Sequence, residues 1–362
     1  MDRAAAGFIA AAIRTGSLKP PELLTLLVGL DSPEALWSAA PERMIGLGIA
    51  PAAALAFARS RPAADPKKEA DELARHDVAA VAFNESEYPS QLRQIFDPPA
   101  ILFYRGRLAA LRGHLPVAVV GTRGMTEYGA RAARLFTRQL ATAGCTIVSG
   151  LALGVDAAAH EACLEANGIT VAVLASGTDR PSVGPRTNAG LAERIVKADG
   201  VVVSEYPPGT ISWKDNFLKR NRIIAGLSRG VVVIEAAERS GALVTARLAL
   251  EQGRDVFAVP GPIFSPKSLG CNRLIQTGAS PLITIEDIFQ VYDLKISTPA
   301  VAKQTIIDPA QKAIFTSLAA GSATTDELAV KTGLTPPEVL AAVSALELAG
   351  LVATHYNKVV RN

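Results

Sequence analysis

One stretch of the chain combines side chains that bind phosphate with an aromatic ring. Residues 214–229 read KDNFLKRNRIIAGLSR, with Phe217 among five cations and Asp215 as the one acid. Cations bind the phosphates of a nucleic acid, and an aromatic face lets a base stack. The stretch therefore indicates a groove for a phosphodiester strand, with a solvated helix face as the alternative interpretation. The cations are Lys214, Lys219, Arg220, Arg222 and Arg229.

The composition shows that any such groove must be local. The 362 residues are enough for two or three domains, and 49% of them are apolar, so large cores are available. The net charge is only +3, and residues 1–66 and 301–362 each carry as many acids as cations. A nucleic-acid site therefore has to come from clustered cations rather than from the charge of the whole chain.

Cysteine spacing and hydropathy predict a cytoplasmic protein. Cys145, Cys163 and Cys271 are far apart and form no C-x-x-C pair, which is typical of reduced thiols. The apolar N-terminal stretch is interrupted by Arg14, which argues against a signal peptide. No apolar run reaches the length of a membrane span.

The chain divides by pattern into three parts and a linker. Residues 1–66 are rich in alanine, and a proline stands where each new helix could start, which predicts a small helical module. The Gly-Leu-Gly at 46–48 resembles the turn of helix-hairpin-helix and sterile-alpha-motif-like modules, with a packing turn as the alternative. Residues 67–293 form the central part, and residues 294–305 a polar linker. Residues 306–362 form the C-terminal part.

Six short apolar runs in the central part predict a parallel sheet. They alternate with amphipathic stretches of helical spacing, and strands that are apolar on both faces belong to a doubly wound α/β fold. We therefore expect an extended Rossmann-like sheet. The runs are residues 117–120, 146–148, 170–174, 201–203, 231–234 and 256–259.

The loops after these strands predict an anion-binding rim. Ligands gather at the carboxyl ends of parallel strands, and glycine lets backbone N–H groups approach an anion. A tight turn also needs glycine, so any single loop has a structural alternative. Arg123 follows the first strand and would point into the crevice, unless it pairs with Glu205 or Glu235. The rim residues are Gly121, Thr122, Ser149, Gly150, Ser240 and Gly241.

The sequence predicts no catalytic constellation, no metal and no cofactor. It contains neither a G-x-G-x-x-G fingerprint nor a P-loop, and no G-x-S-x-G turn. Asp156 and His160 are spaced to pair on a helix and orient a base, but a capping or helix–helix hydrogen bond for His160 is the preferred interpretation. No second histidine gives a metal-ligand spacing.

Residues 306–362 predict a winged helix. Asp308-Pro309, Thr324-x-x-Glu327 and Thr335-Pro336-Pro337-Glu338 each begin a helix, and a short hairpin follows at residues 351–360. The third helix carries two glutamates and no cation. A DNA-reading helix offers Arg, Lys, Asn or Gln, so we expect protein contact or an accessory role here.

The ordered motifs resemble the DNA-processing protein A family (DprA, also called Smf). They are GTR-x4-YG, SGLALGVDAAAH, SEYPPG, F-x-x-RNRIIAGLS, EA-x3-SGALVTARLAL and VPG-x8-G-x-N-x-LI-x-x-GA, across about residues 80–285. The resemblance implies single-stranded DNA binding in a Rossmann-domain pocket, and loading of RecA during natural transformation. It also implies a homodimer through the Rossmann domains, with no catalytic activity.

The resemblance also implies roles for individual residues. Arg123 and Lys214 would contact phosphate, and Phe217 would stack on a base. Gly121, Thr122, Ser149 and Gly150 would supply rim donors. The family's F-x-x-R-N-R is completed by Arg220, Asn221 and Arg222. A role in holding the shape of the pocket is implied for Glu235, Ser240 and Gly241, and Asn221 could have this role as well.

Two departures from the family pattern leave details open. Leu218 stands where many relatives have proline, so the local turn can differ. After the third strand the chain lacks the Tyr-Pro pair of relatives, and either Arg180 or Arg186 would supply the cation there.

Two other functions stay in consideration. A nucleotide phosphoribohydrolase of the lysine-decarboxylase-like Rossmann class would show a P-G-G-x-G-T rim, and residues 235–242 lack it. In the other alternative, the winged helix binds duplex DNA while the Rossmann domain only dimerises. The balanced charge of the C-terminal part argues against it.

Overall fold

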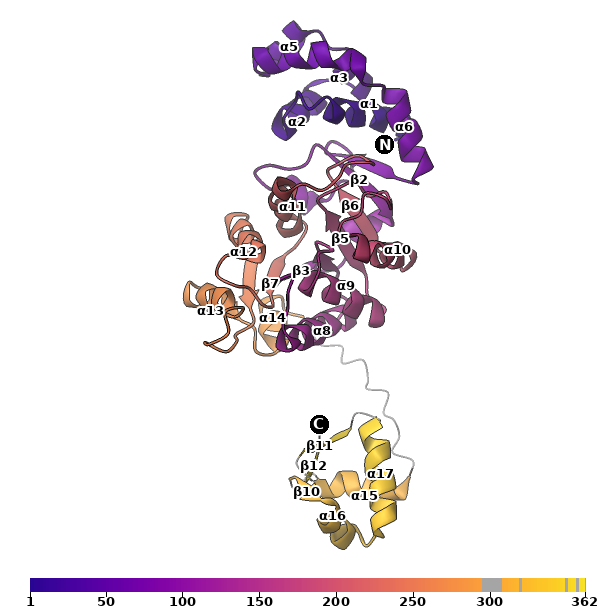
Figure 1. The fold of residues 1–362 in the computed structure, drawn as a ribbon, viewed down its shortest axis with the longest axis vertical. Coiled ribbons are helices and arrows are strands. Elements are labelled where there is room, and N and C mark those ends of the chain that lie inside the picture. Colours follow the sequence, from indigo (N-terminus) through magenta and orange to yellow (C-terminus); the bar gives the residue numbers. More distant parts are fainter. Residues whose placement is uncertain (295–307, 319–320, 349–350, 356–357, 362) are drawn as a thin grey trace. The chain divides into compact units, whose positions relative to one another are not determined.

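The computed structural model describes residues 1–294, 308–318, 321–348, 351–355 and 358–361. The chain forms two compact units, residues 1–295 and 296–362, and each is described by itself (Figure 1). The predicted linker at residues 294–305 lies, apart from its first residue, outside the described residues. The domain boundaries predicted at residues 66 and 293 stay predictions.

The first unit begins with the predicted helical module. Proline occupies the first turn of the second to fifth helices, because its fixed φ suits that position and its missing N–H costs nothing there. The helices share one core with Val78, Ile101 and Phe103 at the edge of the sheet. The helices are α1 (Arg3–Arg14), α2 (Pro20–Gly29), α3 (Pro33–Ser38), α4 (Pro41–Gly46), α5 (Pro51–Ser60) and α6 (Pro66–Arg75), with the short helix η1 (Arg61–Ala63).

A nine-stranded sheet forms the rest of this unit, in the order β1-β2-β6-β5-β4-β3-β7-β8-β9. The six predicted strands are confirmed with ends shifted by about one residue, and they run parallel as expected. The strands are β1 (Ala79–Ala82), β2 (Ile101–Gly106), β3 (Val117–Val120), β4 (Ile147–Ser149), β5 (Thr170–Leu174), β6 (Val201–Ser204), β7 (Gly230–Val233), β8 (Asp255–Ala258) and β9 (Ser280–Pro281).

Helices cover both faces of the sheet, which confirms the doubly wound fold (Figure 1). One face packs against α8 (Glu127–Thr142), α9 (Val155–Glu165) and α14 (Glu286–Val291). The other packs against α11 (Lys214–Gly226), α12 (Gly241–Glu251) and α13 (Leu269–Gln276). The remaining helices of the unit are α7 (Ser90–Arg93), η2 (Leu108–Arg112), η3 (Arg186–Asn188) and α10 (Ala189–Lys197).

The strand order places a crevice beside β3. Successive strands run from β3 outward through β4, β5 and β6 on one side, and through β7, β8 and β9 on the other. The order therefore reverses between β3 and β7, and loops leaving these strands diverge at their carboxyl ends. Open α/β sheets bind ligands at such a reversal point.

The second unit is the predicted winged helix. Its helices are α15 (Pro309–Ser317), α16 (Thr325–Thr332) and α17 (Pro336–Leu348). Its strands are β10 (Ala323–Thr324), β11 (Val352–His355) and β12 (Lys358–Arg361), paired in the order β10-β12-β11. The hairpin is confirmed, and β10 adds a strand that the sequence did not indicate. None of the described helices of the chain is long and apolar enough to cross a membrane.

The first turn of α16 has the predicted capping box. The Thr324 hydroxyl accepts from the Glu327 amide at 3.2 Å, and the Glu327 carboxylate accepts from the Thr324 amide at 2.9 Å. Thr324→Ala leaves one helix N–H without this acceptor and should lower the local stability of the second unit by about 1 kcal/mol. Amide hydrogen exchange of residues 325–332 in the full chain should speed up accordingly. The exposed Ser322→Ala is the control, and equal exchange in both variants would refute the role of the cap.

Candidate nucleic-acid interface

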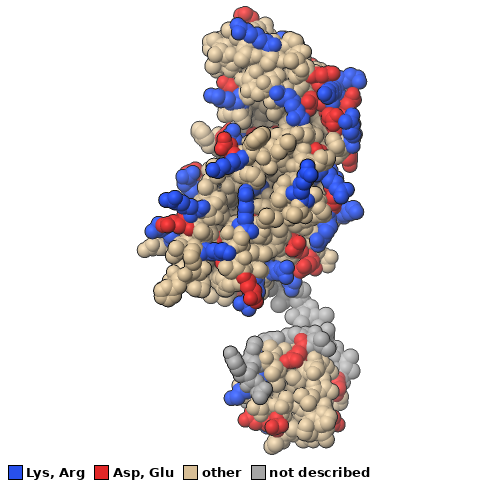
Figure 2. Space-filling view, viewed as in Figure 1, with Lys and Arg blue, Asp and Glu red and all other residues tan. Residues whose placement is uncertain are grey.

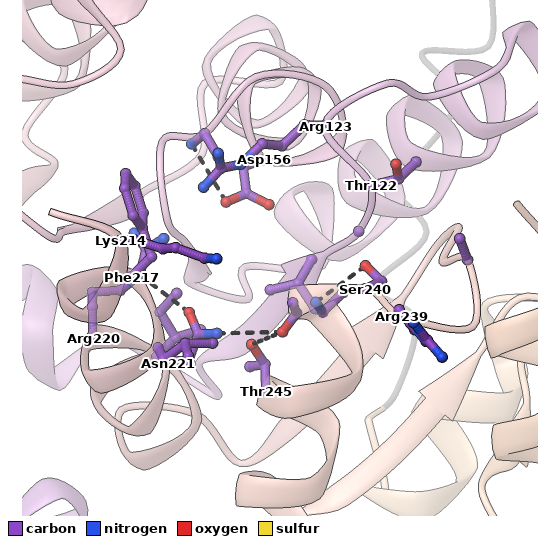
Figure 3. A pocket seen from close by; sticks show the side chains of 18 residues that line it. Thr122, Arg123, Asp156, Lys214, Phe217, Arg220, Asn221, Arg239, Ser240 and Thr245 are labelled. Carbon is purple, nitrogen blue, oxygen red and sulfur yellow. Dashed lines mark hydrogen bonds between the residues drawn. The ribbon is translucent and has the colours of Figure 1, made fainter. Parts of the chain in front are cut away.

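A pocket of about 600 Å³ lies at the carboxyl end of β3, between the first turns of α11 and α12 (Figure 3). Residues from four loops and helices that are far apart in sequence meet there. Its lining includes nine of the predicted site residues, namely Gly121, Thr122, Arg123, Lys214, Phe217, Arg220, Asn221, Ser240 and Gly241.

The residues of helix α11 change abruptly from mostly polar to apolar along its length, and this change explains where the helix lies. Its first two turns are polar, and its last residues, Ile223 to Gly226, are buried in the core of the sheet face. The apolar end fixes the helix on the sheet, while the polar start reaches the crevice. Burial of the residues that follow them thus places Lys214 and Arg220 at the pocket.

Arg220 anchors this helix from below the pocket. Its side chain is buried, and its guanidinium donates to the carbonyl of Gly150 at 2.6 Å and to the carbonyl of Val173. Burial lowers the pKa of Arg220 to about 10, so the group stays charged at neutral pH. A Cβ at position 150 would overlap the guanidinium, so only glycine permits this approach.

Asp156 is the one acidic residue among the described residues that line the pocket. Its side chain accepts from the amides of Gly150 at 3.2 Å and Ala152 at 3.4 Å. Burial raises the pKa of Asp156, and the positive charge of Arg220 acts in the opposite direction. The floor of the pocket therefore carries a buried carboxyl group and a buried guanidinium rather than bare apolar surface.

A stack of cations and one ring forms the side of the pocket. The Arg123 guanidinium lies 4.6 Å from the centre of the Phe217 ring, and the Arg220 guanidinium lies 6.0 Å from it. Arg123 and Lys214 are exposed, and they approach the same space from opposite sides (Figure 3). The alternative ion pairs of Arg123 are not formed. Glu205 binds Arg222 instead, and Glu235 binds Thr126.

The opposite side of the pocket is the start of α12. The Ser240 hydroxyl accepts from the amide of Ala242 at 3.3 Å and caps the helix. The Asn221 amide donates to the carbonyl of Gly241 at 3.3 Å, which ties α11 to α12 across the crevice. Asn221 thus joins the two helices that flank the pocket, and the pocket-shaping roles of Asn221 and Ser240 stay predictions.

Several predicted residues lie outside the pocket lining. The Ser149 hydroxyl donates to the carbonyl of Val119, and Glu235 accepts from the amide and hydroxyl of Thr126 at 2.8 Å. Both are buried, so their hydrogen bonds hold the first two strand-to-helix turns. The lining also excludes Gly150, Arg180, Arg186 and Arg222.

Arg222 and the two candidate arginines after β5 differ in environment. Arg222 is buried and bridges Asp97 at 3.1 Å and Glu205 at 2.7 Å. Its charge is thus used inside the fold, away from the crevice. Arg180 and Arg186 are both exposed, so the structure does not select between them.

Sequence reasoning missed Arg239, an exposed cation of the pocket rim. It stands directly before Ser240 in the loop after β7, and it points away from the pocket centre (Figure 3). The sequence could have indicated Arg239 as a site residue, because it is the one arginine between two predicted pocket residues, Glu235 and Ser240. Asp156 was considered only as a partner of His160.

Asp156 and His160 do not pair, and the preferred capping or helix–helix hydrogen bond of His160 is also wrong. The His160 ring nitrogen Nδ1 instead lies 2.7 Å from the Thr170 hydroxyl, so helix α9 is linked to strand β5. Burial lowers the pKa of His160 to about 3, and the imidazole is neutral at physiological pH. Among the described residues no cluster of three His, Cys, Asp or Glu is arranged to hold a metal ion.

Residues 79–293 match the family of DNA recombination-mediator protein A, and residues 298–357 match the DprA winged helix domain. The chain belongs to this family. The protein Smf of Escherichia coli (strain K12) is 44% identical over 274 residues, which cover 74% of this chain and 72% of that protein. The DNA processing protein DprA of Bacillus subtilis (strain 168) is 43% identical over 213 residues, or 59% of this chain and 71% of the relative.

Two solved structures of DprA proteins resemble the fold. DprA from Streptococcus pneumoniae has a TM-score of 0.69 at 34% identity, over 80% of this chain and 98% of that chain. DNA processing protein A from Helicobacter pylori has a TM-score of 0.54 at 31% identity, over 60% and 97% of the two chains. The latter structure concerns the single-stranded DNA binding mode of the Helicobacter pylori protein. The resemblance to DprA and Smf read from the motifs is confirmed.

The buried histidine predicts a measurable pH dependence. Its pKa is about 3 in the folded chain, against an ordinary value of 6.5, so below about pH 6.5 only the unfolded chain takes up this proton. The free energy of unfolding should therefore decrease as the pH is lowered. This group should contribute a loss of about 2 kcal/mol between about pH 7.5 and pH 5.

Urea denaturation of His160→Gln should show a correspondingly smaller loss of stability over that range. The exposed His114→Gln is the matched control and should keep the pH dependence of the parent. If His160→Gln and the parent lose the same free energy between the two pH values, His160 is not buried in its neutral form.

Proposed function

We propose that this protein binds single-stranded DNA in the pocket beside β3 and acts there as a recombination mediator. The observation that supports this best is the Arg123–Phe217 stack, with Lys214 facing the same space. Two exposed cations beside one half-buried ring match a nucleotide, which carries a phosphate and a flat base.

The preference for a single strand follows from what the pocket offers. A ring can stack on a base only where the base is free of its neighbour and its partner, as in a single strand. Lys214 and Arg123 supply charge for the phosphates, and their contacts carry no sequence information. Arg239 at the far rim extends the basic surface. Figure 2 shows lysine and arginine side chains scattered on the face drawn, with no continuous basic field.

The finer parts of the proposal rest on family membership. The protein would protect incoming single strands in the cytoplasm and help to load RecA during natural transformation, without catalysis. It would act as a homodimer through the Rossmann domain. The exposed Ile263 and Phe264 between β8 and α13, with Leu269 at the start of α13, offer apolar surface for that contact. Arg180 or Arg186 would continue the DNA path beyond the pocket.

Fluorescence anisotropy of labelled oligo-dT and of a matching duplex, titrated at several salt concentrations, tests the proposal. Tight and salt-sensitive binding of the single strand, with weak binding of the duplex, is the expected result. Equal affinity for both forms would overturn it. Hydrolysis of a nucleoside monophosphate by the same preparation would instead support the phosphoribohydrolase alternative.

Arg123 and Lys214, two of the exposed cations of the pocket, should act through phosphate. Arg123→Ala and Lys214→Ala should each weaken binding of all sequences alike, and each should reduce the slope of log affinity against log salt by about one. Arg138→Ala removes an exposed cation of α8 that pairs with Glu165 and serves as the control. A salt slope equal to that of the parent in both pocket variants would contradict their phosphate contacts.

Phe217 should act through stacking instead. Phe217→Ala should cost on the order of 1–3 kcal/mol of binding free energy, with the salt slope nearly unchanged. Leu218→Ala is the matched control, because Leu218 also lines the pocket and is 48% exposed but has no aromatic face. Similar losses in the two variants would point to general apolar contact rather than stacking.

A further inference from the structure

Trp213 is an exposed aromatic residue that the proposed binding pocket does not use. It is 71% exposed and immediately precedes α11, and Ile211 beside it is 68% exposed. The other tryptophan, Trp37, packs against Phe8 at 6.3 Å and Phe57 at 5.9 Å. Within the described residues, no ring and no cation stacks on Trp213. Together, Trp213 and Ile211 offer exposed apolar surface that is available to a ligand.

The position of Trp213 relative to the pocket follows from helix geometry. Its carbonyl accepts from the amide of Asn216 at 3.0 Å, so it forms the N-cap of α11. As the N-cap, Trp213 has an extended backbone, with φ −109° and ψ 160°, and it stands immediately before the first turn of the helix. The part of α11 that lines the pocket begins with Lys214 and continues with Phe217, so Trp213 adjoins the pocket lining directly in the chain.

The loop that presents Trp213 is anchored at several points. Arg14 of α1 donates to the carbonyl of Pro208, and to the Thr210 hydroxyl at 3.4 Å. The amide of Gly209 donates to Asp179 at 2.8 Å, and the carbonyl of Thr210 accepts from the amide of Gly177 at 2.9 Å. A loop fixed in this way presents a side chain at a small cost in conformational entropy.

We propose that Trp213 is a second stacking platform, for the base next to the one that stacks on Phe217. Lys214, between the two rings in sequence, would contact the phosphate that joins these two nucleotides. The N-terminus of the 13-residue α11 adds partial positive charge at the same place. This inference rests on the proposed single-stranded DNA binding and extends the path of the strand outside the pocket.

The surroundings of Trp213 favour a nucleobase over a protein partner. Lys214, Asp215 and Lys219 stand exposed on the same end of α11. The cores of protein interfaces are depleted of lysine and aspartate, whereas sites for single strands combine aromatic rings with cations. The chain therefore offers at this helix end the same combination that it offers in the pocket.

The fluorescence of Trp213 gives a direct test. Trp37→Phe makes Trp213 the sole tryptophan of the chain, and titration with oligo-dT should then quench the emission as a base stacks on the indole. In anisotropy titrations Trp213→Ala should raise the Kd for oligo-dT by about 5- to 150-fold, with the salt slope unchanged. Trp213→Tyr keeps an aromatic face and should restore most of the affinity.

Ile211→Ala is the control, because it removes an exposed apolar side chain of the same loop that has no aromatic face. An unchanged Kd in Trp213→Ala, a loss equal to that of Ile211→Ala, or no recovery in Trp213→Tyr would each overturn the inference. If the parent binds oligo-dT and Phe217→Ala weakens it, the proposed function survives these outcomes. A parent without single-strand preference would overturn both.

Discussion

The buried guanidinium of Arg220 is the contact on which the candidate site depends. It joins α11 to the carbonyls at the ends of β4 and β5, through Gly150 and Val173. An unpaired charge in this position would be costly, so the carbonyls and the nearby Asp156 must stay in place around it. The Arg220 guanidinium also lies 6.0 Å from the centre of the Phe217 ring, and the Arg123 guanidinium lies 4.6 Å from it.

The basic stretch of α11 therefore serves two purposes. Arg220 and Arg222 are buried, and their charges are used to fix the helix against the sheet and against Asp97 and Glu205. Lys214 stays exposed, and its charge is free for a ligand. Cations with the same formal charge thus differ in function because they differ in burial, and part of the family's F-x-x-R-N-R motif is explained by the fold alone.

The sheet and the helical module both contribute to the geometry of the pocket. The reversal of strand order beside β3 separates the loops that follow β3 and β7, and α11 and α12 begin on opposite sides of the gap. Asn221 then bridges these helices. On the outer side, Arg14 of α1 reaches the loop before α11, so the N-terminal helices support the segment that carries Trp213 and Lys214.

The sequence by itself determined the order of elements, because hydrophobic period and capping residues are local. It indicated the six parallel strands, the prolines that begin helices, and the caps at Thr324 and Asp308. Motif order also indicated the family. Only the tertiary structure decided which polar residues line the pocket. Arg222, Ser149 and Glu235 are used inside the fold, whereas Arg239 and Asp156 line the pocket. The physical reason is that burial and partner choice depend on chain segments distant in sequence, and no local pattern encodes them.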